Sequence, residues 1–167
     1  MPQALFVFLL IQLSIVAYLD LKTKKIRNYW SILNIALFVL AFFIYPAVFQ
    51  LSLSWFYVPL GMLVIGFILY QFSVMGAGDV KYLFSFLLLV PQNFQIEALL
   101  YLIYTTIAVG FVLISYNAAR NYDKIWGSLR TGELFFIKGV FGSKNTYAPL
   151  IFVSWIWFGW KNWKIIF

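Results

Sequence analysis

The chain contains neither cysteine nor histidine, and only 10% of its 167 residues are charged. Without cysteine there can be no disulfide and no thiol nucleophile. Without histidine, a Ser-His-Asp or Cys-His triad is excluded, and so is the usual proton shuttle at neutral pH. Any acid–base chemistry therefore depends on Asp, Glu, Lys or Tyr, and we expect neither a metal nor a cofactor.

The residues that are present are mostly apolar. Hydrophobic residues make up 64% of the chain, whereas charged residues average about 25% in soluble domains. Because the apolar residues extend along the whole length, we predict an all-α polytopic membrane protein with one domain over residues 1–167. The net charge of +7 is typical of basic cytoplasmic loops. We therefore expect membrane lipid as a partner and no nucleic acid.

Apolar runs separated by short polar stretches indicate about six membrane spans. The predicted spans are 4–19, 29–49, 55–75, a short one that begins within 76–81 and ends near residue 91, 96–116, and 148–160. Residues 117–147 form the one long polar segment, and within it 133–141 is apolar enough to lie along the membrane surface.

Basic residues predict the orientation of these spans. Lysines and arginines follow the first span, occur at Lys81 and recur in 117–147, whereas the alternate loops 50–54 and 91–95 have none. Because basic loops stay in the cytoplasm, both termini are expected outside, in a multi-pass protein of the cytoplasmic (inner) membrane.

This topology places two acidic residues on the same side of the membrane. Asp20 ends the first span and Asp79 follows the third, so both are expected at the cytoplasmic side, whereas Glu97 falls on the opposite side. Two carboxylates in one site share a proton, so that one can activate a water while the other polarises a carbonyl group. The alternative is that each acid pairs with a nearby base, Asp20 with Lys24 and Asp79 with Lys81.

Gly76 and Gly78 precede the second of these acids. Glycine permits close approach of backbone to another segment, and it also permits a positive φ that would redirect Asp79. A simple turn between two spans is the competing interpretation.

These residues resemble a known family. Gly76-Ala77-Gly78-Asp79 resembles the Gly-x-Gly-Asp motif of intramembrane aspartic proteases. Asp20 followed by Lys25-Ile26-Arg27-Asn28 resembles the first-aspartate motif of type IV prepilin peptidases, in which Asp-x-Lys, here Asp79-Val80-Lys81, completes the second motif. The resemblance implies a membrane endopeptidase that removes the leader of type IV prepilin or pseudopilin precursors at the cytoplasmic face. Asp20 and Asp79 would be catalytic, with Gly76, Gly78, Lys81 and Asn28 in support.

The chain departs from this family in two respects. Arg27 stands where the family usually has proline, which bears on the geometry of the loop. The family's methyltransferase members carry an extra segment, often with zinc-binding cysteines, before the first aspartate, and here 19 residues without cysteine precede Asp20. We therefore expect a short form that cleaves without N-methylation.

Two other functions remain open from the sequence. One is a non-catalytic membrane subunit or small transporter whose aspartates pair with lysines or relay protons, although a transporter usually has an acid within a span. The other is an intramembrane protease with a different range of substrates, against which the Asp20 motif with Asn28 argues.

Overall fold

The computed structural model of the chain describes residues 1–49, 52–71, 75–122 and 146–167, and every regular element in these ranges is helical. The elements are α1 (Gln3–Thr23), α2 (Asn28–Ile44), the 3-10 helix η1 (Leu53–Phe56), α3 (Tyr57–Gln71), α4 (Ala77–Leu89), α5 (Gln92–Arg120), α8 (Ala148–Lys161) and α9 (Trp163–Ile166). The predicted surface segment 133–141 lies outside the described residues.

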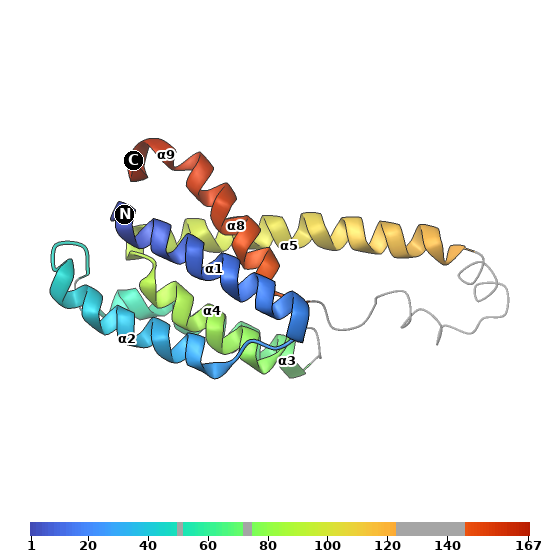
Figure 1. Cartoon of the computed structure of the whole chain (residues 1–167), viewed down its shortest axis with the longest axis horizontal. Coiled ribbons are helices and arrows are strands. Elements are labelled where there is room, and N and C mark those ends of the chain that lie inside the picture. Colours follow the sequence, from blue (N-terminus) through green and yellow to red (C-terminus); the bar gives the residue numbers. More distant parts are fainter. Residues whose placement is uncertain (50–51, 72–74, 123–145) are drawn as a thin grey trace.

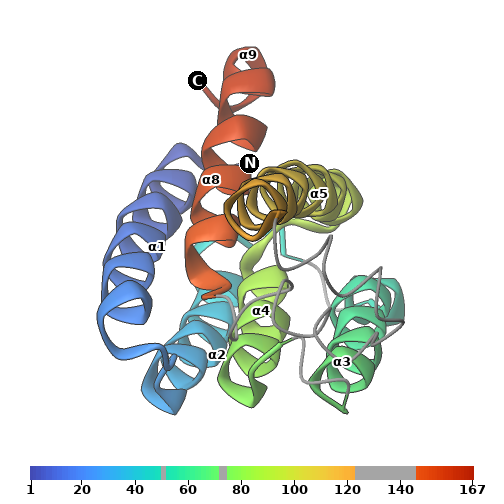
Figure 2. The ribbon, with the colours of Figure 1, turned by 90° about the vertical axis from the view of Figure 1, so that its right-hand side faces the viewer.

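The longer helices form two layers. Viewed from one end in Figure 2, α1, α8 and α5 lie above α2, α4 and α3. In the upper layer α8 packs between α1 and α5, and in the lower layer α4 packs between α2 and α3. Successive helices run in opposite directions, so both termini lie at the same end of the bundle (Figure 1). The C-terminal end of α1 and the N-terminal ends of α4 and α8 lie at the other end.

Several helix boundaries differ from those predicted. α1 continues through Asp20 to Thr23, so this acid belongs to the last helical turn and not to a loop. α2 ends at Ile44 and not at residue 49, because Pro46 lacks an N–H and disfavours helix in the residue before it. α5 is longer than the predicted 96–116 at both ends. The prediction that a helix begins within 76–81 is confirmed by α4.

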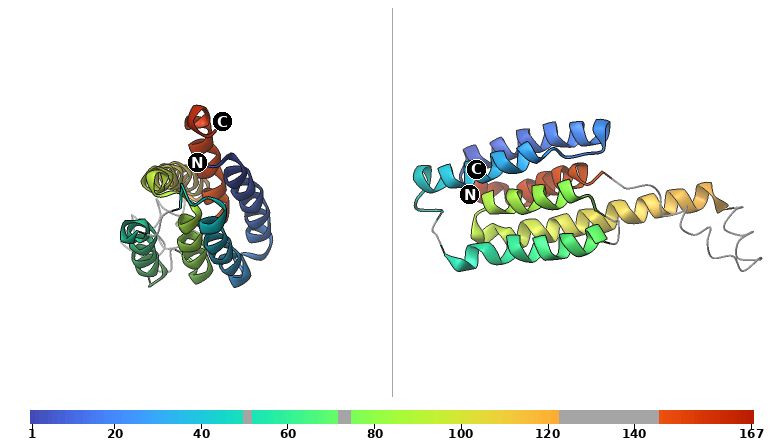
Figure 3. Two further views of the ribbon diagram at one scale, coloured as in Figure 1. Left: turned by 90° about the vertical axis from the view of Figure 1, so that its left-hand side faces the viewer. Right: turned by 90° about the horizontal axis from the view of Figure 1, so that it is seen from below.

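In the described ranges, three helical segments are long and apolar enough to cross a membrane: Gln3–Thr23, Leu53–Gln71 and Gln92–Arg120, with the shorter α2 also apolar. α5 has 29 residues and is about 43 Å long at 1.5 Å per residue; it extends past the ends of the other helices (Figure 3, right). Its outward face is apolar, with Phe111 72% exposed. Such a surface fits lipid better than water, which supports a membrane protein. The number of spans and their orientation stay predictions.

A buried polar bridge joins three helices in the interior. The Gln12 side-chain amide on α1 donates to Asn34 Oδ1 on α2 at 2.6 Å, and the Asn34 amide donates to Ser85 Oγ on α4 at 3.2 Å. All three side chains are buried. Since hydrogen bonds across apolar helix interfaces tie the helices together, this bridge fixes the relative heights of the helices that carry Asp20 and Asp79.

The end of the bundle away from Asp20 and Asp79 is closed by aromatic packing. The rings of Phe38, Phe42, Phe49, Trp55 and Phe56 pack against one another. The Trp55 indole N–H also donates to the carbonyl of Leu88 at 3.1 Å, which joins η1 to the last turn of α4. One end of the bundle therefore holds this aromatic cluster, and the other end carries the two buried acids.

Candidate active site

Asp20 is anchored by a helix that lies far away in the sequence. Its side chain is 2% exposed, and its Oδ2 accepts a hydrogen bond from the backbone N–H of Ala148 at 3.1 Å. The N–H of Tyr147 faces the same carboxyl group. These donors belong to the N-terminus of α8, where backbone N–H groups lack helical partners and the helix dipole favours negative charge. The carboxylate of Asp20 thus caps α8.

Asp79 is anchored within its own helix. It is the third residue of α4 and is 8% exposed, and its Oδ2 accepts the backbone N–H of Gly76 at 3.0 Å. An acidic side chain at this position commonly reaches back to the residue that caps the helix. The same bond starts α4 and fixes the orientation of the carboxyl group.

The two carboxyl groups lie at the same end of the bundle, near enough for the charge of Asp20 to act on Asp79. Among the described residues, neither acid forms an ion pair with a lysine or arginine. The alternative pairings with Lys24 and Lys81 are therefore not formed. Two neighbouring carboxyl groups without a counterion favour a state in which only one of them is ionised, and such a pair can activate a water molecule.

Gly78 permits a close contact between the two parts of the site. A Cβ on this residue would lie 2.6 Å from the backbone oxygen of Ile26, in the loop after α1. The expectation of close backbone approach is therefore confirmed at Gly78. The expectation of a positive φ is wrong, because Gly76 has φ −80° and neither glycine has φ in the left-handed region. The first turn of α4 is ordinary helix.

The loop after α1 has its own local support. Lys24 adopts a left-handed conformation with φ 52°, and its N–H donates to the backbone oxygen of Asp20 at 2.7 Å. The Thr23 hydroxyl is within hydrogen-bonding distance of the carbonyls of Leu19, at 2.8 Å, and Lys25, at 3.1 Å. These contacts end α1 one turn beyond Asp20 and turn the chain toward α4.

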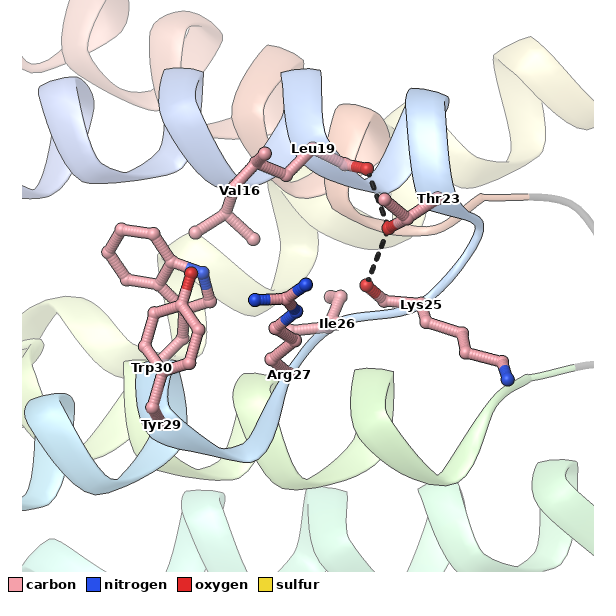
Figure 4. Close-up of a pocket in the computed structure, with 8 residues that line it drawn as sticks. All are labelled: Val16, Leu19, Thr23, Lys25, Ile26, Arg27, Tyr29 and Trp30. Carbon is pink, nitrogen blue, oxygen red and sulfur yellow. Dashed lines mark hydrogen bonds between the residues drawn. The ribbon is translucent and has the colours of Figure 1, made fainter.

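A small pocket of about 100 Å³ lies beside this loop (Figure 4). In Figure 4 the guanidinium group of Arg27 points into it, between Val16 and the rings of Tyr29 and Trp30. Arg27 has φ −77°, within the range that proline adopts. The backbone at this position thus has a φ that a proline would also adopt, although the residue differs.

The two remaining predicted residues, Asn28 and Lys81, are exposed. Asn28 is the first residue of α2. Lys81 lies on the face of α4 toward α3, where it lines an apolar groove with Phe67 and Tyr70. In the described part of the chain no group of three His, Cys, Asp or Glu residues gathers to hold a metal ion.

The sequence analysis missed the contribution of α8. Pro149 lies in its first turn, and the helix starts at Ala148, where the last apolar run was predicted to begin. Nothing in the sequence near Tyr147 and Ala148 indicated that their N–H groups face Asp20, which lies 128 residues before Ala148.

A family model described as the type IV leader peptidase family matches residues 7–117. This range contains Asp20 and Asp79 and ends before α8. Neither a curated protein nor a solved structure matches the chain.

Proposed function

Because the chain belongs to the type IV leader peptidase family, and is thus a protease, we propose that it is a membrane aspartic endopeptidase. It removes the leader peptide of type IV prepilin or pseudopilin-like precursors at the cytoplasmic face of the membrane, and it does so without N-methylation. Asp20 and Asp79 are its catalytic residues.

The observation that carries this proposal is the pair of buried carboxyl groups. They come from helices far apart in sequence, lie at one end of the bundle and have no basic partner among the described residues. Their hydrogen bonds to the N–H groups of Ala148 and Gly76 hold the carboxyl groups in place without neutralising them. A structural role for buried acids would usually require a counterion.

The chemistry follows from one proton shared by two carboxyl groups. The ionised aspartate accepts a proton from water as the water oxygen adds to the carbon of the scissile peptide bond. The protonated aspartate donates a hydrogen bond to the carbonyl oxygen and then its proton, which gives a neutral tetrahedral diol. Proton transfer to the leaving nitrogen breaks the C–N bond and releases a carboxylic acid and an amine.

The cytoplasmic position of the site is supported by charge. Lys22, Lys24, Lys25, Arg27 and Lys81 lie near the end of the bundle where Asp20 and Asp79 lie. An excess of basic residues is typical of cytoplasmic loops. Lys161 and Lys164, near the C-terminus, are fewer, and they lie at the opposite end.

The test is leader removal in cells that express the chain with a prepilin. Asp20→Asn and Asp79→Asn should each abolish cleavage, because an amide can neither accept the proton of water nor supply the shared proton. Asparagine still offers an oxygen to the N–H groups of Ala148 or Gly76, so both variants should fold.

Glu97→Gln is the matched control. Glu97 is a carboxylate near the opposite end, bonded to the Asn162 amide at 2.8 Å, and its variant should cleave as the wild type does. Full cleavage by either asparagine variant would exclude the paired-aspartate mechanism. Methyl transfer from S-adenosylmethionine to the new N-terminus by the purified chain would contradict the absence of N-methylation.

A further inference from the structure

Tyr147 faces Asp20 through its backbone N–H and lies within electrostatic range of Asp79, although it lies outside the residues that the family model matches. It is the N-cap residue of α8, and its backbone N–H faces the carboxyl group of Asp20. Its half-buried side chain extends to α5, where its hydroxyl lies 3.3 Å from Thr106 Oγ1. One residue thus connects α1, α5 and α8 at the end of the bundle that carries the aspartates.

The phenol ring also lies near Asp79. Burial raises the pKa of the Tyr147 phenol above its ordinary value, and the negative charge of Asp79 raises it further. A phenol with a raised pKa keeps its proton at neutral pH. Tyr147 is therefore a neutral hydrogen-bond donor within electrostatic range of Asp79.

In its hydrogen bond with Thr106, the Tyr147 hydroxyl is the donor. The Thr106 hydroxyl donates its one proton to the carbonyl of Leu102 at 2.7 Å. Tyr147 must therefore be the donor toward Thr106, and at 3.3 Å this bond is longer than the usual O–H···O distance of about 2.7–2.8 Å. A donor held by a long bond can turn to a better acceptor at little cost.

We propose that the Tyr147 hydroxyl is a third polar group of the cleavage site, which leaves Thr106 and donates a hydrogen bond to the scissile carbonyl oxygen as the tetrahedral intermediate forms. This inference rests on the proposed peptidase function. The step transfers no proton from tyrosine: the phenol O–H stabilises the oxygen as its electron density increases, and Asp20 and Asp79 carry the proton transfers. A donor aimed at developing charge acts mainly in the transition state.

The test compares Tyr147→Phe with Thr106→Val in steady-state cleavage of a prepilin by purified protein in detergent. Tyr147→Phe keeps the ring and removes the donor, so kcat should fall about 100-fold while KM changes less than about twofold. Thr106→Val removes only the acceptor of the resting bond, so its kcat should stay within about twofold of the wild type. Tyr101→Phe, on α5 beside Trp157, is a matched control and should behave as the wild type does.

Three outcomes would overturn the proposal. The first is a wild-type kcat in Tyr147→Phe, and the second is a rise in KM of this variant with kcat unchanged. The third is an equal loss of kcat in Tyr147→Phe and Thr106→Val, which would show that the hydroxyl only ties α8 to α5. Asp20→Asn and Asp79→Asn measured in the same assay keep this inference separate from the proposed function. If they still cleave, the proposed mechanism is wrong; if they are inactive while Tyr147→Phe keeps its kcat, only the role of Tyr147 is wrong.

Discussion

Asp20 accepts its hydrogen bond from the N-terminus of a helix at the far end of the chain, whereas Asp79 accepts one from the residue that starts its own helix. The Asp79 half of the site forms whenever α4 forms. The Asp20 half forms only when α1 and α8 are packed together. The comparison indicates that the geometry of the site depends on tertiary packing at Asp20 and on local capping at Asp79, so substitutions should affect the two halves differently.

The contact that joins the two halves should be the most sensitive. In Gly78→Ala the new Cβ would lie 2.6 Å from the backbone oxygen of Ile26, and backbone cannot move aside as a flexible side chain can. We expect the free energy of unfolding to fall by about 1–3 kcal/mol. Leader cleavage should also fall strongly, because the added methyl group pushes the loop after Asp20 away from the helix that carries Asp79. Thermal unfolding in detergent and the cleavage assay measure the two effects.

Gly61→Ala is the control for this substitution. Gly61 lies in α3, and apart from its own stretch of helix no atom of the described residues lies within 4 Å of the added Cβ, so alanine should leave stability and cleavage unchanged or improve stability slightly. Wild-type cleavage by Gly78→Ala would show that the contact between the two halves is not required.

Breaking the polar bridge should have the next largest effect on stability and cleavage, because the bridge sets the relative heights of the helices. Asn34→Leu leaves the Gln12 amide and the Ser85 hydroxyl without their partner. The expected cost is about 1 kcal/mol, typical of a hydrogen bond between helices in a membrane. Cleavage should fall by more than stability alone explains, because the bridge lines up α1, α2 and α4.

The control is Ser154→Ala. The Ser154 hydroxyl is buried, and it donates to the carbonyl of Ile151 in its own helix. Its loss should therefore change neither the free energy of unfolding nor the rate of leader cleavage much. If Asn34→Leu and Ser154→Ala behave alike in both assays, the bridge does not set the relative position of the helices.

The smallest effect is expected within the Asp79 half alone. In Gly76→Ala the added Cβ would lie 3.0 Å from Asp79 Oδ2, a tight contact that a small rotation of the carboxyl group relieves. The backbone φ of −80° at Gly76 suits alanine. Stability should therefore stay unchanged while kcat falls a few-fold, since the carboxyl group is displaced slightly.

Steady-state kinetics on purified protein measure this change, with Gly110→Ala as the control because the space around Gly110 is open. A loss of stability in Gly76→Ala without a change in kcat would show that the residue serves the start of α4 and not the orientation of Asp79.

Much of the bundle and half of the site's geometry could be predicted from residue patterns. Long apolar runs predicted the helices. Pro46 also indicates where α2 ends, because proline disfavours helix in the residue before it. The number of helices between Asp20 and Asp79 predicted that they lie at the same end, as they do. The close approach at Gly78 was also predicted, because glycine lacks a Cβ and lets another backbone segment come near.

Other features had no signal in the sequence. Gln12, Asn34 and Ser85 are ordinary polar residues in apolar helices, and their bridge depends on the rotation of three helices at once. The extension of α1 past Asp20 is set by the left-handed conformation of Lys24, which a lysine seldom adopts and which no residue pattern marks.

The sequence by itself determined a helical membrane protein, the alternation of its helices, and therefore the end at which both acids lie, because apolar length and helix direction are local properties. Only the tertiary structure decided what holds Asp20. The N–H groups at the start of every helix are chemically alike, so the acceptor that they face depends on which helix packs beside them. Here the packing of α8 between α1 and α5 brings the N–H of Ala148 to Asp20 and the phenol of Tyr147 near Asp79.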